Sequence, residues 1–320
     1  MKSVITGGAG YIGSTLADAL QARGDEVHII DNFSTGREEF LADFAGTIHR
    51  LDLTDEGAPF ESIFEGAHTV YHLAANADVR FGWNDTRRDL KQNVIATLRV
   101  AEAAAAAGVV DVVFSSTGSV YGEATQIPTP EDTAFPDQTS LYGASKAAAE
   151  AYLSAFATNG SFRVTVLRFV SVLGPRYTHG HVIDFIRQLT EHPDHLTVLG
   201  NGTQRKSYMH IDDCIQGVIG LRASDEGSRF GVFNLGVPDA CTVKDSVGWI
   251  TERMGLSPTI TFGEDDRGWV GDNPFILLDV EKARGNGWQA EHGIRESVQT
   301  TVDWILDNQW VLGAHDTRAT

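Results

Sequence analysis

Tyr142 and Lys146 are the two residues of this 320-residue chain whose types and spacing most directly suggest chemistry. They stand near the start of residues 141–157, an alanine-rich run typical of a helix, so they fall at i and i+4 on one helical face. A lysine ammonium one turn away favours the phenolate form of a tyrosine, and a phenolate can take a proton from an alcohol. Because Tyr and Lys also meet at this spacing in ordinary helices, the pair indicates a catalytic base only together with its surroundings.

A glycine-rich turn lies near the N-terminus, between a short apolar strand at 3–6 and a run of helical periodicity at 14–23. Gly7, Gly10 and Gly13 allow the backbone to turn tightly and to approach a pyrophosphate at the N-terminus of the following helix. Strand, glycine turn and helix together predict a dinucleotide-binding site, with Tyr11 and Ile12 in the same turn.

Asp31 follows the next predicted strand, 26–30, about twenty residues after the glycine turn. A carboxylate there accepts hydrogen bonds from both hydroxyls of the adenosine ribose and repels a 2′-phosphate, so the sequence predicts NAD rather than NADP. The alternative is that Asp31 is an ordinary turn residue at a strand end. The polar turn after it is predicted to lie near the same ribose and comprises Asn32, Phe33, Ser34, Thr35 and Gly36.

Strands and helices alternate through the first half of the chain, with strands at 47–51, 68–73, 109–115 and 163–169 and helices at 93–107 and from Tyr142. Such alternation predicts an α/β fold with a parallel sheet and crossover helices. Open sheets of this kind bind ligands at the carboxyl ends of their strands. The candidate residues at those ends are Asp52, Leu53, Leu73, Ala74, Ala75 and Ser115.

After residue 175 the pattern loosens into short segments at 182–189, 196–199, 245–254, 259–262 and 297–306, which suggest a smaller lobe. We predict a cofactor-binding domain at 1–170 plus about 207–236, and a substrate-binding lobe at about 171–206 plus 237–320. The segments 211–221 and 232–235 are expected to return to the main sheet. Arg176, Arg205, Lys206 and Arg267 stand out against an acidic background; singly each is typical of a surface charge, but together they could hold a diphosphate.

The composition is that of a globular protein, with 42% hydrophobic and 21% charged residues and a net charge of -18. This acidic balance argues against unaided binding to nucleic acid or to an anionic membrane, and no signal peptide or membrane span is expected. Cys214 and Cys241 form no C-x-x-C motif, and the eleven histidines show no ligand spacing. We therefore predict no metal site and a reducing, cytoplasmic location.

These motifs resemble the extended short-chain dehydrogenase/reductase family, and within it the nucleotide-sugar epimerases of the UDP-glucose 4-epimerase type, including archaeal-like forms. The matching residues span nearly the whole chain in the expected order: 6–13, 31–36, 52–53, 72–75, Asn93, Thr117, Tyr142 with Lys146, and 168–169. The resemblance implies a Rossmann-type doubly wound parallel sheet with a smaller α/β substrate-binding lobe. It also implies a homodimer and NAD that stays bound through the catalytic cycle.

The resemblance further implies that Tyr142 acts as base, that Lys146 holds the nicotinamide ribose and lowers the tyrosine pKa, and that Thr117 bonds the sugar O4. The chemistry would be internal: hydride leaves C4, the 4-keto sugar turns over in the site, and hydride returns to the opposite face. Further cofactor contacts are implied at Asn93, Ser115 and Val170. Substrate contacts are implied at Ser171, Val182, Thr197, Leu199, Lys206, Arg267 and Asp272.

Alternative chemistries stay open within this resemblance. Dehydratases of this kind carry an acidic pair directly after the threonine, and decarboxylases usually carry Glu at the second of these positions, whereas this chain has Gly118 and Ser119. Ser171 stands where glucose epimerases usually have Asn and UDP-glucuronate 4-epimerases often have Thr, and Arg176 lies nearby. We therefore expect 4-epimerisation of UDP-glucose and UDP-galactose. The first alternative is 4-epimerisation of UDP-glucuronate, and a 4,6-dehydratase or a decarboxylase is the next alternative. An NAD-binding scaffold without chemistry is disfavoured because Tyr142, Lys146 and Thr117 are all retained.

Overall fold

The computed structural model describes residues 1–77, 79, 82–134, 137–223, 229–268, 273 and 275–313, so the predicted substrate contact Asp272 lies outside the described residues. A seven-stranded sheet forms its centre, in the order β11-β6-β5-β4-β1-β2-β3, and every pairing in it is parallel. Its strands are β1 (Lys2–Thr6), β2 (Glu26–Asp31), β3 (Thr47–Arg50), β4 (Thr69–His72), β5 (Asp111–Thr117), β6 (Arg163–Phe169) and β11 (Phe230–Leu235).

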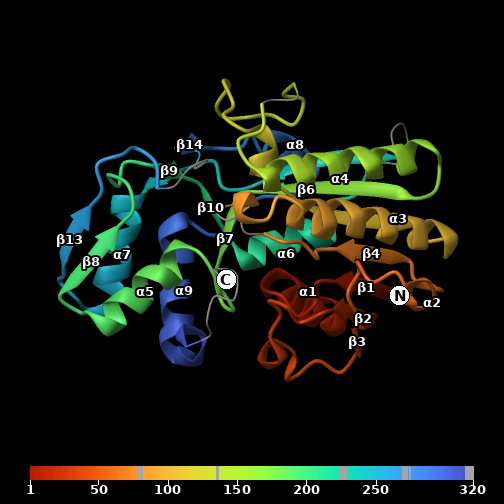
Figure 1. The fold of residues 1–320 in the computed structure, drawn as a ribbon, viewed down its shortest axis with the longest axis horizontal. Helices are drawn as coiled ribbons and strands as arrows, with labels where there is room; N and C mark the ends of the chain where they lie inside the picture. The colour runs from red at the N-terminus through yellow and green to blue at the C-terminus, as the bar shows by residue number, and fades with distance from the viewer. Residues whose placement is uncertain are drawn as a thin grey trace.

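Both faces of this sheet are buried, as expected for a parallel sheet between helices. Neighbouring residues of β1 show this directly, since Val4 belongs to one hydrophobic cluster and Ile5 to the other. Helices α1 (Tyr11–Ala22) and α6 (Ile211–Gly220) cover one face, and α2 (Phe60–Phe64), α3 (Ala96–Ala106) and α4 (Leu141–Thr158) cover the other. Figure 1 shows α3 and α4 side by side along the sheet. The predicted doubly wound α/β fold is confirmed.

The helix predicted at 93–107 starts earlier than expected. A π-helical segment, η3 (Leu90–Ile95), precedes α3 and contains Asn93. Short 3-10 turns occur at η1 (Glu38–Leu41), η2 (Gly82–Asn84), η4 (Gly118–Tyr121) and η5 (Gln309–Leu312). π-Helical turns are often found at functional sites, and this one turns Asn93 toward α4.

The rest of the chain forms the smaller lobe at the left of Figure 1, in which short two- and three-stranded sheets replace one continuous sheet. Its strands are β7 (Ser171–Leu173), β8 (His195–Val198), β9 (Arg205–Lys206), β10 (Tyr208–His210), β12 (Cys241–Thr242), β13 (Thr259–Phe262) and β14 (Phe275–Ile276). Its helices are α5 (His181–Glu191), α7 (Val243–Met254) and α9 (Ile294–Asp307), whereas α8 (Glu281–Gly285) packs against β11 of the main sheet. The proposed domain boundaries stay a prediction.

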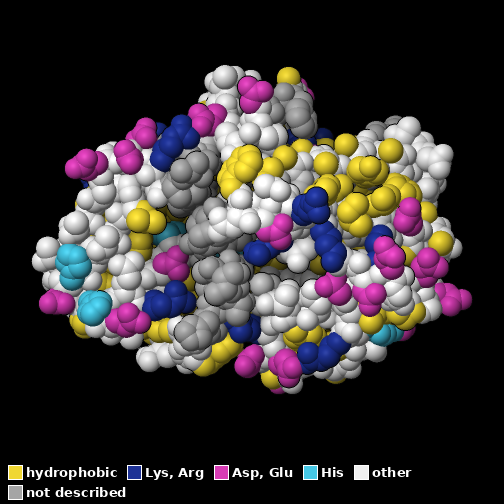
Figure 2. All heavy atoms as spheres, in the orientation of Figure 1, with side chains coloured by type: hydrophobic (Ala, Val, Ile, Leu, Met, Phe, Trp, Pro, Cys, Tyr) yellow, Lys and Arg dark blue, Asp and Glu magenta, His cyan; other side chains and the backbone are white. Residues whose placement is uncertain are grey.

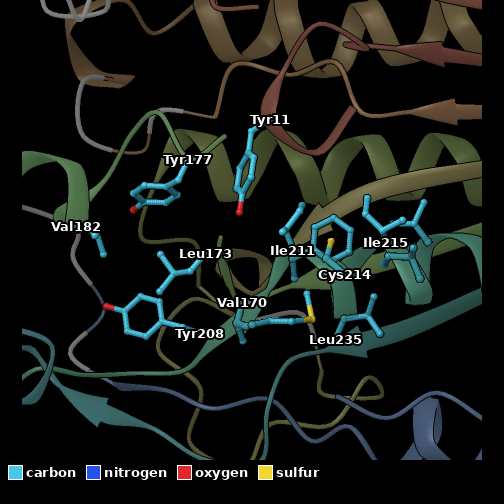
Figure 3. Packing of buried hydrophobic residues seen from close by; sticks show 14 of the residues in the cluster. Tyr11, Val170, Leu173, Tyr177, Val182, Tyr208, Ile211, Cys214, Ile215 and Leu235 are labelled. Atoms are coloured by element: carbon cyan, nitrogen blue, oxygen red, sulfur yellow. The ribbon is translucent and has the colours of Figure 1, made fainter. Parts of the chain in front are cut away.

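One hydrophobic cluster joins the lobe to the main sheet (Figure 3). Tyr11 of the glycine turn meets Tyr177 edge-on, with ring centroids 6.0 Å apart, and Val182 of α5 belongs to the same cluster. Cys214 and Cys241 are buried free thiols. Within the described ranges no helix combines the length and apolar character needed to cross a bilayer. The cytoplasmic location stays a prediction.

Candidate active site

The first turn of α4 packs closely against η4, the turn that follows β5. Ser140 caps the helix by accepting a hydrogen bond from the Gly143 amide at 3.0 Å. A Cβ at Gly143 would lie only 2.7 Å from the Ser119 carbonyl oxygen, so glycine is needed for this approach. Close packing here brings Tyr142 of α4 next to Thr117 at the end of β5.

Thr117, Tyr142 and Lys146, the three predicted catalytic residues, meet at this contact. The Thr117 side chain lies close enough to the Tyr142 phenol to oppose the rise of its pKa. Lys146 is almost fully buried, donates to the Ser115 carbonyl at 2.7 Å and lies 4.4 Å above the Phe114 ring. An alcohol brought to the Thr117–Tyr142 pair would therefore meet a hydroxyl to orient it and a phenol to exchange its proton.

Burial dominates the electrostatics of this site, where Lys146 is predicted to hold down the pKa of Tyr142. Burial raises the pKa of Tyr142 to about 12, the Thr117 side chain opposes this rise, and the Asp89 carboxylate adds to it. Burial also lowers the pKa of Lys146 to about 7, against a smaller opposing effect of Glu150. Burial disfavours the charged form of both groups, which accounts for both pKa shifts. The lowering of the Tyr142 pKa by Lys146 stays a prediction.

A second buried network holds α4 in register one turn beyond Lys146. Glu150 accepts a hydrogen bond from Ser116 and two from the Arg168 guanidinium, at 3.1 and 2.6 Å. Arg168 also donates to the Tyr121 hydroxyl at 2.7 Å. Because Ser116 directly precedes Thr117, this network fixes the end of β5 relative to the helix that carries Tyr142.

A cleft of about 280 Å³ runs along the carboxyl ends of the strands and reaches Ser115. Most predicted cofactor residues line it, as strand ends in a parallel sheet should. These are Gly7, Gly10, Tyr11, Ile12, Gly13, Asp31, Asn32, Ser34, Thr35, Gly36, Asp52, Leu53, Leu73, Ala74, Ala75 and Ser115.

The glycine turn has the tight backbone that a dinucleotide requires. Gly7 has φ of 73°, and a Cβ there would lie 2.7 Å from the Ala74 backbone; a Cβ at Gly13 would lie 2.1 Å from the Gly7 carbonyl oxygen. Asp31 accepts backbone hydrogen bonds from Ala9 at 2.9 Å and from Phe33 at 2.7 Å, which fix its carboxylate at the wall of the cleft. These residues fit NAD. When bound, NAD supplies the hydride acceptor and, in its oxidised form, a positive charge.

Some predicted cofactor residues lie outside the cleft lining. The Phe33 ring packs under the Arg50 guanidinium at 3.9 Å, because its positive φ of 56° accompanies a sharp turn after Asp31. Val170 is buried in the core. Tyr142 and Lys146 lie beyond the Ser115 end of the lining, connected to it by the Lys146–Ser115 bond.

Asn93 is buried and acts as a support in this structure. Its amide group donates to the Ser145 hydroxyl at 2.8 Å and to the Asn76 carbonyl at 3.1 Å, and its oxygen accepts from the Asn76 amide at 2.8 Å. It thus ties the turn after β4 to α4, directly beside Lys146. A direct cofactor contact of Asn93 stays a prediction.

Sequence reasoning missed several residues of the cleft. Arg37, Asn76 and Gln92 line it, and the first two directly follow predicted segments, so extending those segments by one residue would have found them. Thr178, His179, Asp184 and Arg187 reach the cleft from the smaller lobe. No spacing rule connects these four to the glycine turn.

The predicted substrate residues are spread over the smaller lobe. Ser171 and Thr197 are exposed, Leu199 is 65% exposed, and the Val182 side chain is fully buried in the core (Figure 3). Val182 therefore has no side-chain surface left for a ligand in this structure.

The basic residues of the lobe are divided among several partners. Lys206 donates to the Asn273 carbonyl, and Arg267 pairs with Glu123 at 2.7 Å. Arg205 stacks on Phe275 at 4.4 Å. A single cluster of all four basic residues is therefore not formed.

Arg176 is the clearest exception among the basic residues. It pairs with Asp18 of α1 at 2.7 Å, and its guanidinium lies 5.8 Å from the Phe40 ring centroid. The positive φ of 70° at Arg176 accompanies a turn that carries its side chain to α1, and its part in a diphosphate cluster stays a prediction.

Known proteins similar to this chain share this architecture over nearly its whole length. A UDP-glucose 4-epimerase of Corynebacterium glutamicum is 33% identical over 330 residues, covering 98% of this chain and 95% of that protein. UDP-glucuronic acid decarboxylase 1 of Arabidopsis thaliana is 31% identical, covering 94% of this chain and 69% of that protein. The crystal structure of a UDP-galactose 4-epimerase superposes with a TM-score of 0.85 at 36% identity, covering 97% of this chain and all of that one.

The family model of the NAD dependent epimerase/dehydratase family matches residues 3–236, a range that holds the glycine turn, Asp31, Thr117, Tyr142 and Lys146. The matched range therefore contains both the glycine turn of the cleft and the three residues that meet at η4. The similarity to epimerases and to a decarboxylase extends over nearly the whole chain. The chain belongs to the NAD-dependent epimerase/dehydratase family.

Proposed function

We propose that this chain catalyses NAD-dependent 4-epimerisation of a nucleotide sugar, with UDP-glucose and UDP-galactose as its substrates. The meeting of Thr117 and Tyr142 next to Lys146 carries this proposal. Thr117 orients the sugar O4 and Tyr142 takes its proton while hydride leaves C4. The 4-keto sugar then turns over, hydride returns to its other face, and Tyr142 gives the proton back.

The residues after Thr117 support epimerisation over dehydration. A 4,6-dehydratase must remove the C5 proton and protonate the departing O6, which requires acid and base groups near C5 and C6. Here Gly118 has no side chain, and the Ser119 hydroxyl lies 3.2 Å from the Thr117 hydroxyl. A serine hydroxyl ionises too weakly to serve either role near neutral pH. Decarboxylation lacks the usual glutamate at the Ser119 position as well.

The C6 substituent is the finer choice within this proposal. A C6 carboxylate would favour a nearby guanidinium, and Arg176 was the candidate for it. Arg176 is paired with Asp18 through one guanidinium nitrogen, which weakens its support for a uronate and favours a C6 hydroxyl. UDP-glucuronate 4-epimerisation remains the alternative, since one relative is named a UDP-glucuronic acid decarboxylase.

We also propose that the chain works as a homodimer through α3 and α4. Figure 2 shows apolar side chains gathered over these two helices. Ile95, just before α3, and Tyr152 on α4 are 42% and 46% exposed. A second copy of this apolar face would bury them.

Product analysis tests the proposed function directly. NMR spectra would be recorded after incubating the purified protein separately with UDP-galactose, UDP-glucuronate, UDP-N-acetylglucosamine and TDP-glucose. We expect conversion of UDP-galactose to UDP-glucose. A stable 4-keto-6-deoxy sugar or a released pentose nucleotide would contradict epimerisation, and turnover of UDP-glucuronate alone would move the assignment to the uronate.

A further inference from the structure

Three side chains that can ligate metal meet where the start of α6 faces the start of α9. His210 precedes α6, Asp212 lies in its first turn, and His292 comes two residues before α9. One ligand atom from each residue can be chosen so that all three lie within 4.8 Å of one another. None of the three lines the cofactor cleft. The prediction that the histidines form no ligand cluster followed from sequence spacing, which cannot detect a pair brought together by α6 and α9.

His292 is held so that one ring nitrogen stays available. Its Nδ1 lies 3.1 Å from the carboxylate of Asp213, which is fully buried and also accepts the backbone amides of Glu291 at 3.0 Å and His292 at 3.1 Å. An ionised carboxylate can accept hydrogen bonds but cannot donate them. The proton of a neutral His292 therefore sits on Nδ1. The lone pair of Nε2 is therefore available to a cation.

His210 is held in the complementary way. Its Nε2 lies 3.2 Å from the Thr300 hydroxyl, which in turn bonds the Glu296 carbonyl at 3.0 Å. Since the Thr300 proton goes to that carbonyl, its oxygen accepts from Nε2–H, and the lone pair of His210 lies on Nδ1. The Asp212 carboxylate lies 3.5 Å from this Nδ1. Among the described residues, the only hydrogen bond that we find to Nδ1 comes from the Asp212 backbone amide, at a long distance of 3.3 Å.

A metal-ligating histidine characteristically uses its second ring nitrogen to bond a carboxylate, a backbone carbonyl or water. His292 meets that condition through Asp213, and the Thr300 hydroxyl holds the second nitrogen of His210 in the same way. Their rings are stacked with centroids 4.3 Å apart, and Asp212, Asp213 and Glu296 surround them with negative charge. That charge offsets the unfavourable positive end of the α6 dipole.

We propose that His210, Asp212 and His292 bind one divalent zinc-like cation. Bond lengths of about 2.0 to 2.2 Å in a tetrahedral site place ligand atoms about 3.3 Å apart, so the cluster needs to close by up to about 1.5 Å. The stacked rings must also turn so that both lone pairs point at the ion. Two imidazoles and one carboxylate match zinc better than calcium or magnesium, and water completes the fourth position. The ion connects α6 on the main sheet with α9 in the smaller lobe, and its role is structural.

A second histidine pair in this chain provides a matched control. His28 Nδ1 lies 3.1 Å from His49 Nε2, and His28 Nε2 lies 2.9 Å from the Glu26 carboxylate. The two partners of His28 therefore stand at opposite edges of its ring. They cannot converge on one ion, although the residue types are similar.

Cobalt titration tests the site, because four-coordinate Co²⁺ absorbs visible light where protein and NAD do not. Untagged protein, stripped with a chelator and dialysed, is titrated with Co²⁺ and then with Zn²⁺. We expect one equivalent of cobalt per chain, displaced by zinc. Affinity should fall at least about tenfold in His292→Gln and in Asp212→Asn, and stay unchanged in His49→Gln.

Thermal unfolding without metal confirms that each variant is folded before it is compared. Asp212 is exposed, so Asp212→Asn keeps the test informative if His292→Gln fails to fold. Absence of saturable binding at one equivalent overturns the proposal. So does cobalt binding that survives both substitutions, or binding that is lost in His49→Gln.

Discussion

The cofactor cleft and the substrate lobe place their functional residues by different means. In the cleft, Gly7, Asp31 and Asp52 each follow or end a strand of one parallel sheet, and strand pairing alone brings them to a common edge. In the lobe, Lys206 reaches Asn273 and Arg267 reaches Glu123 across long stretches of chain. A parallel sheet thus converts local motifs into a site, whereas the lobe depends on contacts that no local motif specifies.

The largest effect is expected where the sheet edge meets α4. Tyr142→Phe removes the ionisable oxygen and keeps the ring, so turnover should fall by about a hundredfold or more while NAD stays bound. Steady-state kinetics and mass spectrometry of released cofactor measure both quantities. Thr158→Ala, an exposed position at the C-terminal end of the same helix, is the control and should behave as the wild type. Near-normal turnover of Tyr142→Phe would remove this residue from the mechanism.

Cofactor choice tests the cleft half of the comparison. Asp31→Asn removes a negative charge but preserves the shape of the side chain, so relative affinity for NADP should rise about tenfold. Asp52→Asn, another carboxylate of the same cleft, should change the preference little. Mass spectrometry of the cofactor released from wild-type protein should find mainly NAD; mainly NADP would contradict the role of Asp31.

The pKa of Lys146 predicts a pH-dependent stability. Its pKa is about 7 in the folded chain against 10.5 as the ordinary value, so between these values the unfolded chain holds a proton that the folded chain has released. Stability therefore rises with pH from about 7 toward 10.5, by at most about 1.4 kcal/mol per pH unit. Urea unfolding at pH 7 to 9 should show this slope in the wild type and a smaller one in Lys146→Met. Equal slopes would mean that Lys146 stays charged when folded.

A smaller effect is expected in the lobe, where the Arg267–Glu123 pair is partly exposed. If Arg267 contacts the diphosphate, Arg267→Ala raises KM for UDP-galactose by about three- to tenfold, while Glu123→Gln leaves it unchanged or lowers it. Steady-state kinetics of the two variants decide between a substrate contact and a mere surface pair. Equal increases of KM in both variants would indicate that the Arg267–Glu123 ion pair supports substrate binding and that Arg267 makes no contact with the diphosphate.

The sequence predicted the main sheet, the glycine turn and the three residues that meet at η4, because each follows from local periodicity or a strand end. It did not predict the raised pKa of Tyr142, since burial depends on the whole fold. It also did not predict the ion pair of Arg176 with Asp18, which lies on a helix far away in sequence. Substrate contacts stay the least predictable part, because they also depend on residues far apart in sequence.

Isotope labelling at C4 tests the central claim of an internal redox epimerisation most directly. UDP-galactose deuterated at C4 would be incubated with the protein in ordinary water, and the product analysed by NMR and mass spectrometry. The account predicts UDP-glucose that retains deuterium at C4, because the hydride that leaves returns to the same carbon. Loss of the label to solvent, or a product altered at C5 or C6, would contradict it.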